Sequence, residues 1–345
     1  MKRLAIAILA LSLALGTSVF AQTSLSVHFI DVGQGDAILI DYGKYEMLID
    51  GGSGQACSLY LRSAGCIDGA LDVVVATHMD ADHIGGLDEV LAQCQVDSVW
   101  TNGNSNTTAA YYAFQSAYIA EGCRLKVARR DDTIELGSLS MKVIHPSYLT
   151  SDRNNDSVVL LLSFKGWNFL FTGDIGQSVE SILGALNLLP DIDVLKVAHH
   201  GSRGSTSDQF LATTTPQISI ISVGASNSYG HPSPETLKRI GCVVPGSLIL
   251  RTDIHGTVII SVDSSGSAYY SIATHFPAIV AVCDKPPPPP GDSAPCNCSG
   301  PDLNCSNFTT HAVAQRCYDY CKSKGYGDVF RLDADKDGIA CESLP

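Results

Sequence analysis

Residues 77–86 read Thr-His-Met-Asp-Ala-Asp-His-Ile-Gly-Gly and directly follow the apolar run Asp-Val-Val-Val-Ala at 72–76. The apolar run predicts a buried strand that ends in a tight loop. Four side chains of metal-ligand type then fall close together: His78, Asp80, Asp82 and His83. Because such groups repel one another and are costly to desolvate unless a cation lies between them, the motif predicts a metal site.

Three later stretches also place polar residues at the end of an apolar run or in a rigid loop. Asp174 ends the run at 169–174, His199 and His200 follow the run at 195–198, and His231 lies in the Pro-containing loop at 229–234. Each has a simpler interpretation: a strand-terminal Asp often caps a turn or helix, paired His are commonly surface residues, and the loop can be a plain turn. We expect these stretches to converge on the first motif, with a ligand or substrate-binding role for their side chains.

Short strands alternate with helices from residue 22 to about 284, which indicates one large domain of the α+β class. Strands are predicted at 24–30, 37–40, 47–50, 157–164, 168–172, 193–198, 218–223 and 247–250. The stretch 31–36 is predicted to join the first two as a hairpin, and 86–93 has helical spacing. Many short strands with helices between them predict two sheets packed face to face with helices outside, a four-layer αββα sandwich.

The bulk composition restricts the function. The 345-residue chain is 45% hydrophobic, enough for a substantial core, and carries a formal net charge of -13. This charge argues against general electrostatic attraction of the protein surface to nucleic acid or to an anionic membrane. It does not exclude a nucleic-acid substrate, because metal cations can supply positive charge locally.

The N-terminus has the features of a secretory signal peptide at 1–21. Lys2 and Arg3 precede an apolar segment at 4–15, and Val-Phe-Ala at 19–21 fits the cleavage rule for such peptides. A membrane anchor is the weaker interpretation because the apolar segment is short for a bilayer. We expect a secreted or periplasmic protein with no stable membrane span after cleavage and with possible association with the cell envelope.

The cysteines suggest two disulfide sets separated by a linker. Six precede the proline run at 286–290 (Cys57, Cys66, Cys94, Cys123, Cys242, Cys283), and six follow it (Cys296, Cys298, Cys305, Cys317, Cys321, Cys341). Cys57–Cys66 and Cys94–Cys123 are plausible pairs by proximity. We expect a stiff linker at 285–295 and a small domain at 296–345. A structural zinc site in the tail is disfavoured by the cysteine spacing.

The tail carries alternating acidic residues followed by Gly338, a pattern typical of a Ca²⁺ loop. Its candidate calcium ligands are Asp333, Asp335, Asp337 and Glu342. Glu342 is tenth from Asp333, whereas an EF-hand has its bidentate Glu at the twelfth position, so this is not a standard EF-hand. The motif resembles the excalibur calcium-binding domain, which implies a structural Ca²⁺ in a disulfide-stapled module. A solvated acidic turn is the alternative.

The large domain resembles the metallo-β-lactamase superfamily, and most nearly the hydrolase domain of the ComEC competence-protein family. The matching stretches occur in family order at 29–36, 48–52, 77–86, 154–160, 172–174, 195–202 and 229–234. The resemblance implies a two-metal centre. Its ligands would be His78 and Asp80 for one ion, Asp82, His83 and His200 for the other, and Asp174 as the bridge.

The resemblance also implies supporting roles around the two ions. Asp50 would support the metal loop from behind, with Asp36 and Gln34 near the site. His199 would face the substrate. Asn155 lies in the stretch 154–156, where superfamily members with a full zinc set have a further His.

Asp80 influences which metal we expect, because superfamily members with a full zinc set have His at this position. One site is therefore poorer in imidazole and richer in oxygen, which favours Mn²⁺ or Mg²⁺ over Zn²⁺. β-Lactamase activity is not expected because this ligand pattern resembles that of the phosphodiesterase branches.

The resemblance implies a phosphodiesterase in which two metals activate a hydroxide. Asp82 or Asp174 would orient this nucleophile, and His199 or His231 would stabilise the phosphoryl group or protonate the leaving oxygen. We expect an exported nuclease acting on DNA. The alternatives are an esterase for phosphocholine or other cell-envelope phosphodiesters, which suits the acidic charge, and a non-enzymatic Ca²⁺-dependent envelope-binding protein. No protein partner is evident.

Overall fold

The computed structural model describes residues 24–64, 69–274, 276–281, 283, 298, 304–308, 311–328, 331–333, 340 and 341. The chain divides into two compact units, Met1–Cys283 and Asp284–Pro345. The predicted signal peptide and the predicted linker lie outside the described residues. None of the helices in the described residues is both long and apolar enough to cross a membrane.

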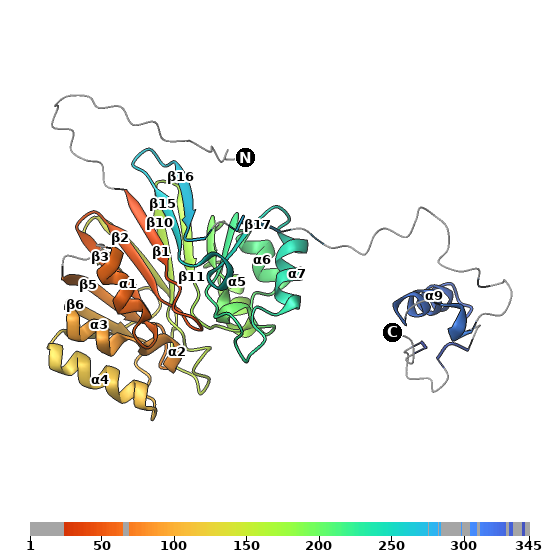
Figure 1. Cartoon of the computed structure of the whole chain (residues 1–345), viewed down its shortest axis with the longest axis horizontal. Helices are drawn as coiled ribbons and strands as arrows, with labels where there is room; N and C mark the ends of the chain where they lie inside the picture. Colours follow the sequence, from red (N-terminus) through yellow and green to blue (C-terminus); the bar gives the residue numbers. More distant parts are fainter. Residues whose placement is uncertain are drawn as a thin grey trace. The chain divides into compact units, whose positions relative to one another are not determined.

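The first unit contains two eight-stranded mixed sheets (Figure 1). One has the order β16 (Ala268–Ile272), β15 (Val258–Val262), β1 (Leu25–Phe29), β2 (Ile38–Tyr42), β3 (Tyr45–Ile49), β5 (Ala70–Ala76), β6 (Gln95–Thr101), β7 (Arg124–Val127). The other has the order β17 (Ile279–Val280), β14 (Leu248–Arg251), β13 (Ile218–Ile221), β12 (Val194–Lys196), β11 (Trp167–Phe171), β10 (Val159–Phe164), β9 (Leu139–His145), β8 (Thr133–Leu136). The short β4 (Gly52–Ser53) pairs with residues 84 and 85.

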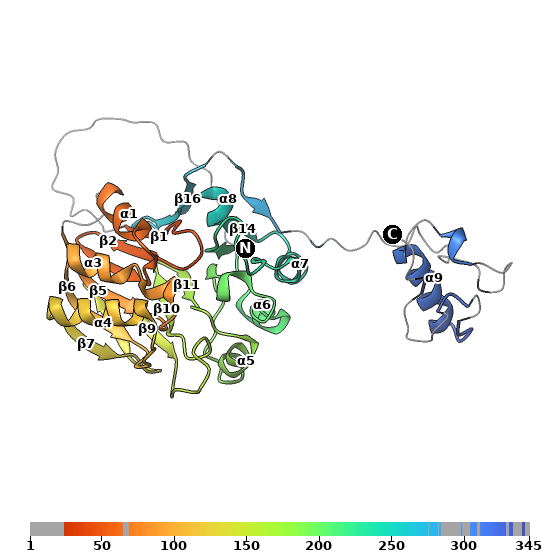
Figure 2. The same ribbon diagram turned by 60° about the horizontal axis from the view of Figure 1, so that its bottom comes forward.

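Helices cover the outer faces of both sheets, as Figures 1 and 2 show. The first sheet is covered by α1 (Ala56–Ala64), α3 (Leu87–Gln93) and α4 (Ala109–Glu121). The second is covered by α5 (Gln177–Ala185), α6 (Asp208–Thr214) and α7 (Pro234–Val243). Three short elements lie in loops: α2 (Ala81–Ile84), the 3-10 turn η1 (Ala198–Gly201) and α8 (Thr252–His255).

Strand alternation explains the four layers. In β5, Val73 and Val75 point into the core between the sheets, whereas Val74 packs under the helices. In β11, Phe169 and Phe171 enter the same central core, and Leu170 faces the opposite helices. A strand buried on both faces reads as a continuous apolar run, as these two do. The αββα sandwich predicted from the sequence is confirmed.

Local predictions agree with the structure where strands meet. Strands β1 and β2 form the predicted antiparallel hairpin, and β10 pairs with β11 across the turn at 165–166. The segment 87–93 is helical, as its spacing indicates. The stretch after β5 differs in one respect, because residues 81–84 form a single helical turn within the predicted loop.

The cysteines follow the prediction only in part. Cys242 is bonded to Cys283 in the first unit. The second unit contains the disulfides Cys298–Cys321 and Cys305–Cys341. The predicted pair Cys94–Cys123 is wrong: both thiols are free, because Cys94 packs beneath the helices and Cys123 lies near the carbonyl of Tyr118. Cys57 is also a free, buried thiol, and its predicted partner Cys66 lies outside the described residues.

The second unit contains η2 (Cys305–Asn307) and α9 (His311–Ser323). Its small core includes Ala314 and the disulfide-bonded cysteines. Asp333 is buried and accepts a hydrogen bond from the Tyr318 hydroxyl at 2.8 Å. The other candidate calcium ligands, Asp335, Asp337 and Glu342, lie outside the described residues, so the calcium site stays a prediction.

Candidate metal centre

Asp50, which directly follows β3, holds the loop that contains the metal-ligand motif. Its Oδ1 accepts the N–H of Thr77 at 2.8 Å, and its Oδ2 accepts the Thr77 hydroxyl at 2.7 Å. Oδ2 also lies 2.8 Å from Nδ1 of His83. Because an ionised carboxylate can only accept, Nδ1 of His83 donates, which leaves Nε2 as the nitrogen that would bind a cation after losing its proton. Asp50 therefore orients His83 with its free nitrogen toward the site.

His200 is oriented in the same way from the other sheet. Its Nδ1 lies 2.9 Å from the carbonyl oxygen of Ser222, which can only accept, so its Nε2 is also the nitrogen that would bind a cation after losing its proton. Nδ1 of His78 lies 3.2 Å from the hydroxyl of Thr77 and 3.3 Å from that of Ser157. Within the described residues, Nε2 of all three imidazoles is buried and has no hydrogen-bond partner.

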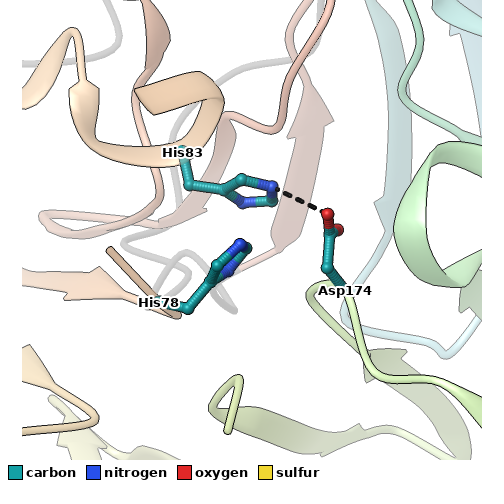
Figure 3. A group of neighbouring side chains, drawn as sticks. All are labelled: His78, His83 and Asp174. Atoms are coloured by element: carbon teal, nitrogen blue, oxygen red, sulfur yellow. Dashed lines mark ion pairs between the residues drawn. The ribbon is translucent and has the colours of Figure 1, made fainter. Parts of the chain in front are cut away.

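These nitrogens and nearby carboxylates form overlapping clusters. Figure 3 shows His78 and His83, from the loop after β5, facing Asp174, which follows β11. Nε2 of His83 lies 3.3 Å from Oδ2 of Asp174. Ligand atoms lie within 4.8 Å of one another in His78–His83–Asp174, in Asp82–His83–His200 and in Asp36–Asp174–His200. The structure thus brings together five of the six predicted metal ligands, from loops that follow strands of both sheets: His78, Asp82, His83, Asp174 and His200.

Asp80 lies at the edge of this arrangement. Its Oδ2 is 3.9 Å from Nε2 of His78, and its Oδ1 is 3.3 Å from Nε of Arg153. Among the described residues, Asp80 belongs to none of the clusters that could hold an ion. Arg153 is a neighbour that the sequence did not indicate. The preference for a hard cation was inferred from Asp80, whereas the clusters that contain His78 or Asp82 each have two imidazoles and one carboxylate.

The backbone turns sharply at the paired histidines, and their side chains differ in exposure. Both have left-handed φ angles, 51° for His199 and 53° for His200, which costs on the order of 1 kcal/mol for each non-glycine residue. His200 is buried, whereas the side chain of His199 is 29% exposed. Nε2 of His199 lies 3.7 Å from Oδ2 of Asp174. His199 therefore borders the centre on its solvent side.

His231 lies one ring farther from the centre. Its ring centroid is 5.6 Å from that of His199, and its Nδ1 has no hydrogen-bond partner among the described residues. Neither His199 nor His231 belongs to a candidate ion cluster in the described residues. Both therefore lie beside these clusters and not within them.

A cavity of about 360 Å³ opens beside Asp174 and His199. Its lining includes Asn155, Gln177 and Ser202. Asn155 holds one wall in place, since its Oδ1 accepts the N–H of Gly176 at 2.9 Å and its Nδ2 donates to Asp152 at 2.6 Å. Asn155 thus shapes the cavity next to the centre.

Comparisons with known proteins agree with this geometry. The model of the metallo-beta-lactamase superfamily matches residues 30–225, which include every residue of the candidate ion clusters. The chain belongs to the metallo-β-lactamase superfamily.

Two relatives of this superfamily member come from competence systems. ComE operon protein 3 of Bacillus subtilis is 30% identical over 257 residues, covering 67% of this chain and 32% of that protein. Competence protein ComA of Neisseria gonorrhoeae is 28% identical over 243 residues, covering 69% of this chain and 32% of that protein. The chain therefore spans about a third of the length of these relatives. The metallo-beta-lactamase fold protein YhfI of Bacillus subtilis is 14% identical, with a TM-score of 0.48 over 72% of this chain and all of that one.

Lys196 is a charged residue of the metallo-β-lactamase site that the sequence interpretation missed. It lies in β12, is fully buried, and forms an ion pair with Oδ2 of Asp36. Its Nζ donates to the carbonyl oxygen of Gly173 at 3.2 Å and lies 3.8 Å from Asp174 Oδ1. The signal was a single lysine inside the apolar run 194–198, three residues before the paired histidines.

Asp36 connects this lysine to the imidazoles. Its Oδ1 lies 3.4 Å from Nδ1 of His200, and its Oδ2 lies 3.8 Å from Nδ1 of His83. Gln34, from the same hairpin loop, points elsewhere: its Oε1 accepts the N–H of Gly224 at 3.2 Å. Asp36 thus supports the centre, and Gln34 joins the hairpin to the loop after β13.

The electrostatics of the centre favour an added cation. Burial opposes protonation of His83 and His200, but the carboxylate of Asp174 and its neighbours outweigh it and hold both pKa values well above the ordinary value. Burial alone would raise the pKa of Asp174, yet the two imidazoles hold it well below its usual range. A divalent cation can replace the protons that these groups otherwise share. Buried imidazole nitrogens without hydrogen-bond partners in the described residues, together with carboxylates in the same clusters, therefore fit a metal ion.

Proposed function

We propose that this protein is an exported metal-dependent phosphodiesterase that hydrolyses DNA, with Mn²⁺ or Zn²⁺ in a two-ion centre. The observation that carries the proposal is the convergence of three buried, unpartnered imidazole nitrogens in the described residues, those of His78, His83 and His200, on the carboxylate of Asp174. The relatives named as competence proteins support DNA as the substrate, because competence is the uptake of DNA. The disulfide Cys242–Cys283 supports an oxidising, extracytoplasmic location.

The residues divide between holding ions and facing substrate. Asp82, His83 and His200 would hold one ion, His78 would contribute to the other, and Asp174 would contact both. Bound divalent ions would polarise a phosphoryl oxygen and lower the pKa of a water molecule. Nε2 of His200 lies 3.4 Å from Asp82 Oδ2, whose side chain is 32% exposed and so reaches the solvent side. Asp82 can therefore orient the attacking water.

His199 is the better placed of the two candidate proton donors. It lies beside Asp174 and lines the cavity, whereas His231 contacts the ring of His199 from farther out. Burial lowers the pKa of the His199 imidazole and so disfavours its protonated form, whereas the neighbouring carboxylate of Asp174 favours that form. A positioned acid at this point would protonate the leaving oxygen of the sugar.

A cleavage assay tests the proposal. The full chain, stripped of metal by chelation, is incubated with labelled single- and double-stranded DNA and with a phosphocholine ester, each with Mn²⁺, Zn²⁺ or Mg²⁺. We expect DNA cleavage only with metal, and a loss of at least about 100-fold in Asp82→Asn. Asp97→Asn, an exposed aspartate on β6, is the matched control and should cleave as the wild type does.

Two results would overturn this function. Hydrolysis of the phosphocholine ester without DNA cleavage would assign the centre to the envelope esterase that its acidic charge also suits. No metal-dependent hydrolysis of any phosphodiester, together with an empty centre by elemental analysis, would leave the non-enzymatic envelope-binding protein.

A further inference from the structure

The loop after β13 holds an exposed tyrosine in a fixed position. The side chain of Asn227 clamps this loop: its Nδ2 donates to the carbonyl oxygens of Gly224 and His231, at 3.0 and 2.6 Å. Its Oδ1 accepts the N–H groups of Tyr229 and His231, at 3.1 and 3.0 Å. With four hydrogen bonds from the Asn227 side chain, the backbone that carries Tyr229 is held in one conformation.

Aromatic rings form a row from this tyrosine to the metal centre. The rings of Tyr229 and His231 are stacked, with centroids 5.7 Å apart and an interplanar angle of 23°. The ring of His231 meets that of His199 edge to face at 5.6 Å. His199 in turn lies 3.7 Å from Asp174. The row therefore begins at the centre and ends at the molecular surface.

Tyr229 is 69% exposed although it stacks on His231. A single exposed aromatic residue is ordinary, so exposure alone indicates nothing. A rigid loop, a ring stacked beneath it and a direct connection to the centre together indicate a platform for another flat ring. Nucleobases bind exposed aromatic rings of this kind, and stacking contributes roughly 1–3 kcal/mol per base.

The charge of the protein gives such a contact a role in binding a polynucleotide. A net charge of -13 gives little general attraction for phosphates, and the centre itself is lined with carboxylates. The metal ions and contacts with the bases would therefore supply part of the binding energy. Stacking supplies it without reading sequence, because every base has a flat face.

We propose that Tyr229 is the base-stacking platform of this site, so that the substrate is single-stranded or frayed nucleic acid with an unpaired base near the scissile phosphate. The inference rests on the proposed function. A base inside a duplex is already stacked on both faces and cannot offer a face to Tyr229. The platform therefore selects strands whose bases are free.

The test compares two labelled single-stranded oligonucleotides of equal length and phosphate number, one intact and one abasic at alternate positions. In the wild-type protein with Mn²⁺, we expect KM for the abasic strand to be roughly ten-fold higher than for the intact strand. In Tyr229→Ala this ratio should fall toward one, whereas Tyr229→Phe, which keeps the ring, should retain it. Tyr269→Ala, which removes a tyrosine of similar exposure on β16, should also keep the ratio.

Binding of both strands is measured in parallel by fluorescence anisotropy, which does not require cleavage. A ratio near one in the wild type, or an unchanged ratio in Tyr229→Ala, would overturn the platform even if DNA is cleaved. If neither strand is cleaved, the proposed function fails by itself. The anisotropy ratio then decides the platform separately, with equal affinities for the two strands counting against it.

Discussion

Nδ1 of His83 donates to Oδ2 of Asp50 across 2.8 Å, and both side chains are fully buried. The same carboxylate accepts two hydrogen bonds from Thr77, the residue directly before His78. One aspartate thus controls both ends of the metal-ligand loop. A carboxylate behind a ligating imidazole fixes the tautomer and the ring orientation.

Replacing Asp50 with Asn is therefore expected to weaken metal binding about 10- to 100-fold while the fold persists. Asn tolerates the left-handed backbone at this position, where φ is 57°. Isothermal titration of the metal-free protein with Mn²⁺ or Zn²⁺ measures the effect. Asp97→Asn is the control, and equal affinities in the two variants would contradict this role of Asp50.

Two glycines of the first hairpin loop allow a matched test of the contact between this loop and the metal loop. A Cβ on Gly35 would lie 2.1 Å from the carbonyl oxygen of Asp82, whereas a Cβ on Gly33 would meet no atom within 4 Å in the described residues. Both have positive φ, so either substitution by Ala should cost about 1 kcal/mol or more in stability.

Only Gly35→Ala should also displace Asp82. We expect it to lower metal affinity at least about ten-fold and Gly33→Ala to leave affinity within about two-fold of the wild type. Metal titration monitored by thermal shift distinguishes the two. Equal losses of affinity would show that the contact at Asp82 does not position the ligand.

Lys196 and Asp36 form a buried ion pair whose partners should depend on each other. Lys196→Met leaves the buried Asp36 carboxylate without its ammonium partner and with only the His200 and His83 imidazoles beside it, which is expected to cost about 3–5 kcal/mol in the free energy of unfolding. Adding Asp36→Asn removes that charge, so the double variant should be more stable than the sum of the two single effects predicts.

Urea denaturation with a chelator present measures the free energy of unfolding of each variant without a contribution from bound metal. Lys126→Met, at an exposed lysine over the ring of Trp100, is the control and should cost less than about 1 kcal/mol. Additive effects of the Lys196 and Asp36 substitutions would mean that the pair is not coupled.

His28, which lies outside the metal centre, should make the free energy of unfolding depend on pH. Burial lowers its pKa to about 4, and its Nδ1 lies 2.8 Å from the Tyr60 hydroxyl. Because an unfolded His has a pKa near 6.5, the unfolded chain binds the proton first as the pH falls. The free energy of unfolding should then decrease from about pH 6.5 to about pH 4, by as much as about 3 kcal/mol.

Comparing wild type with His28→Gln by urea denaturation across that range isolates the contribution. The substitution should flatten the dependence by about this amount, and the ring protons of His28 should titrate near pH 4 by NMR. A midpoint near 6.5 would contradict the burial effect.

Local pattern was sufficient where a residue's role depends on its own strand. The run ending at Ala76 predicted a buried strand followed by a polar loop, and Asp174 follows β11 for the same reason. Pattern was insufficient where two segments distant in sequence meet. Arg153 beside Asp80, and Lys196 beside Asp36, depend on which strand ends are neighbours, and no local feature specifies that.

The cysteines show the same limit. Cys94 and Cys123 are close in sequence and both pack at the cluster beneath the helices of the first sheet, yet both thiols stay free. Cys242 and Cys283 are bonded although 41 residues separate them. Proximity along the chain is a poor guide to pairing once helices and strands intervene.

The sequence by itself determined the layers of this protein and the chemical type of its centre. Alternating apolar residues specify which face of each strand is buried, and His and Asp at strand ends specify ligands for a cation. Only the tertiary structure decided which nitrogen of each imidazole faces the metal centre and which exposed aromatic residue is connected to it. Those properties arise from hydrogen bonds to Asp50, Ser222 and Asn227, which come from segments far from the motif.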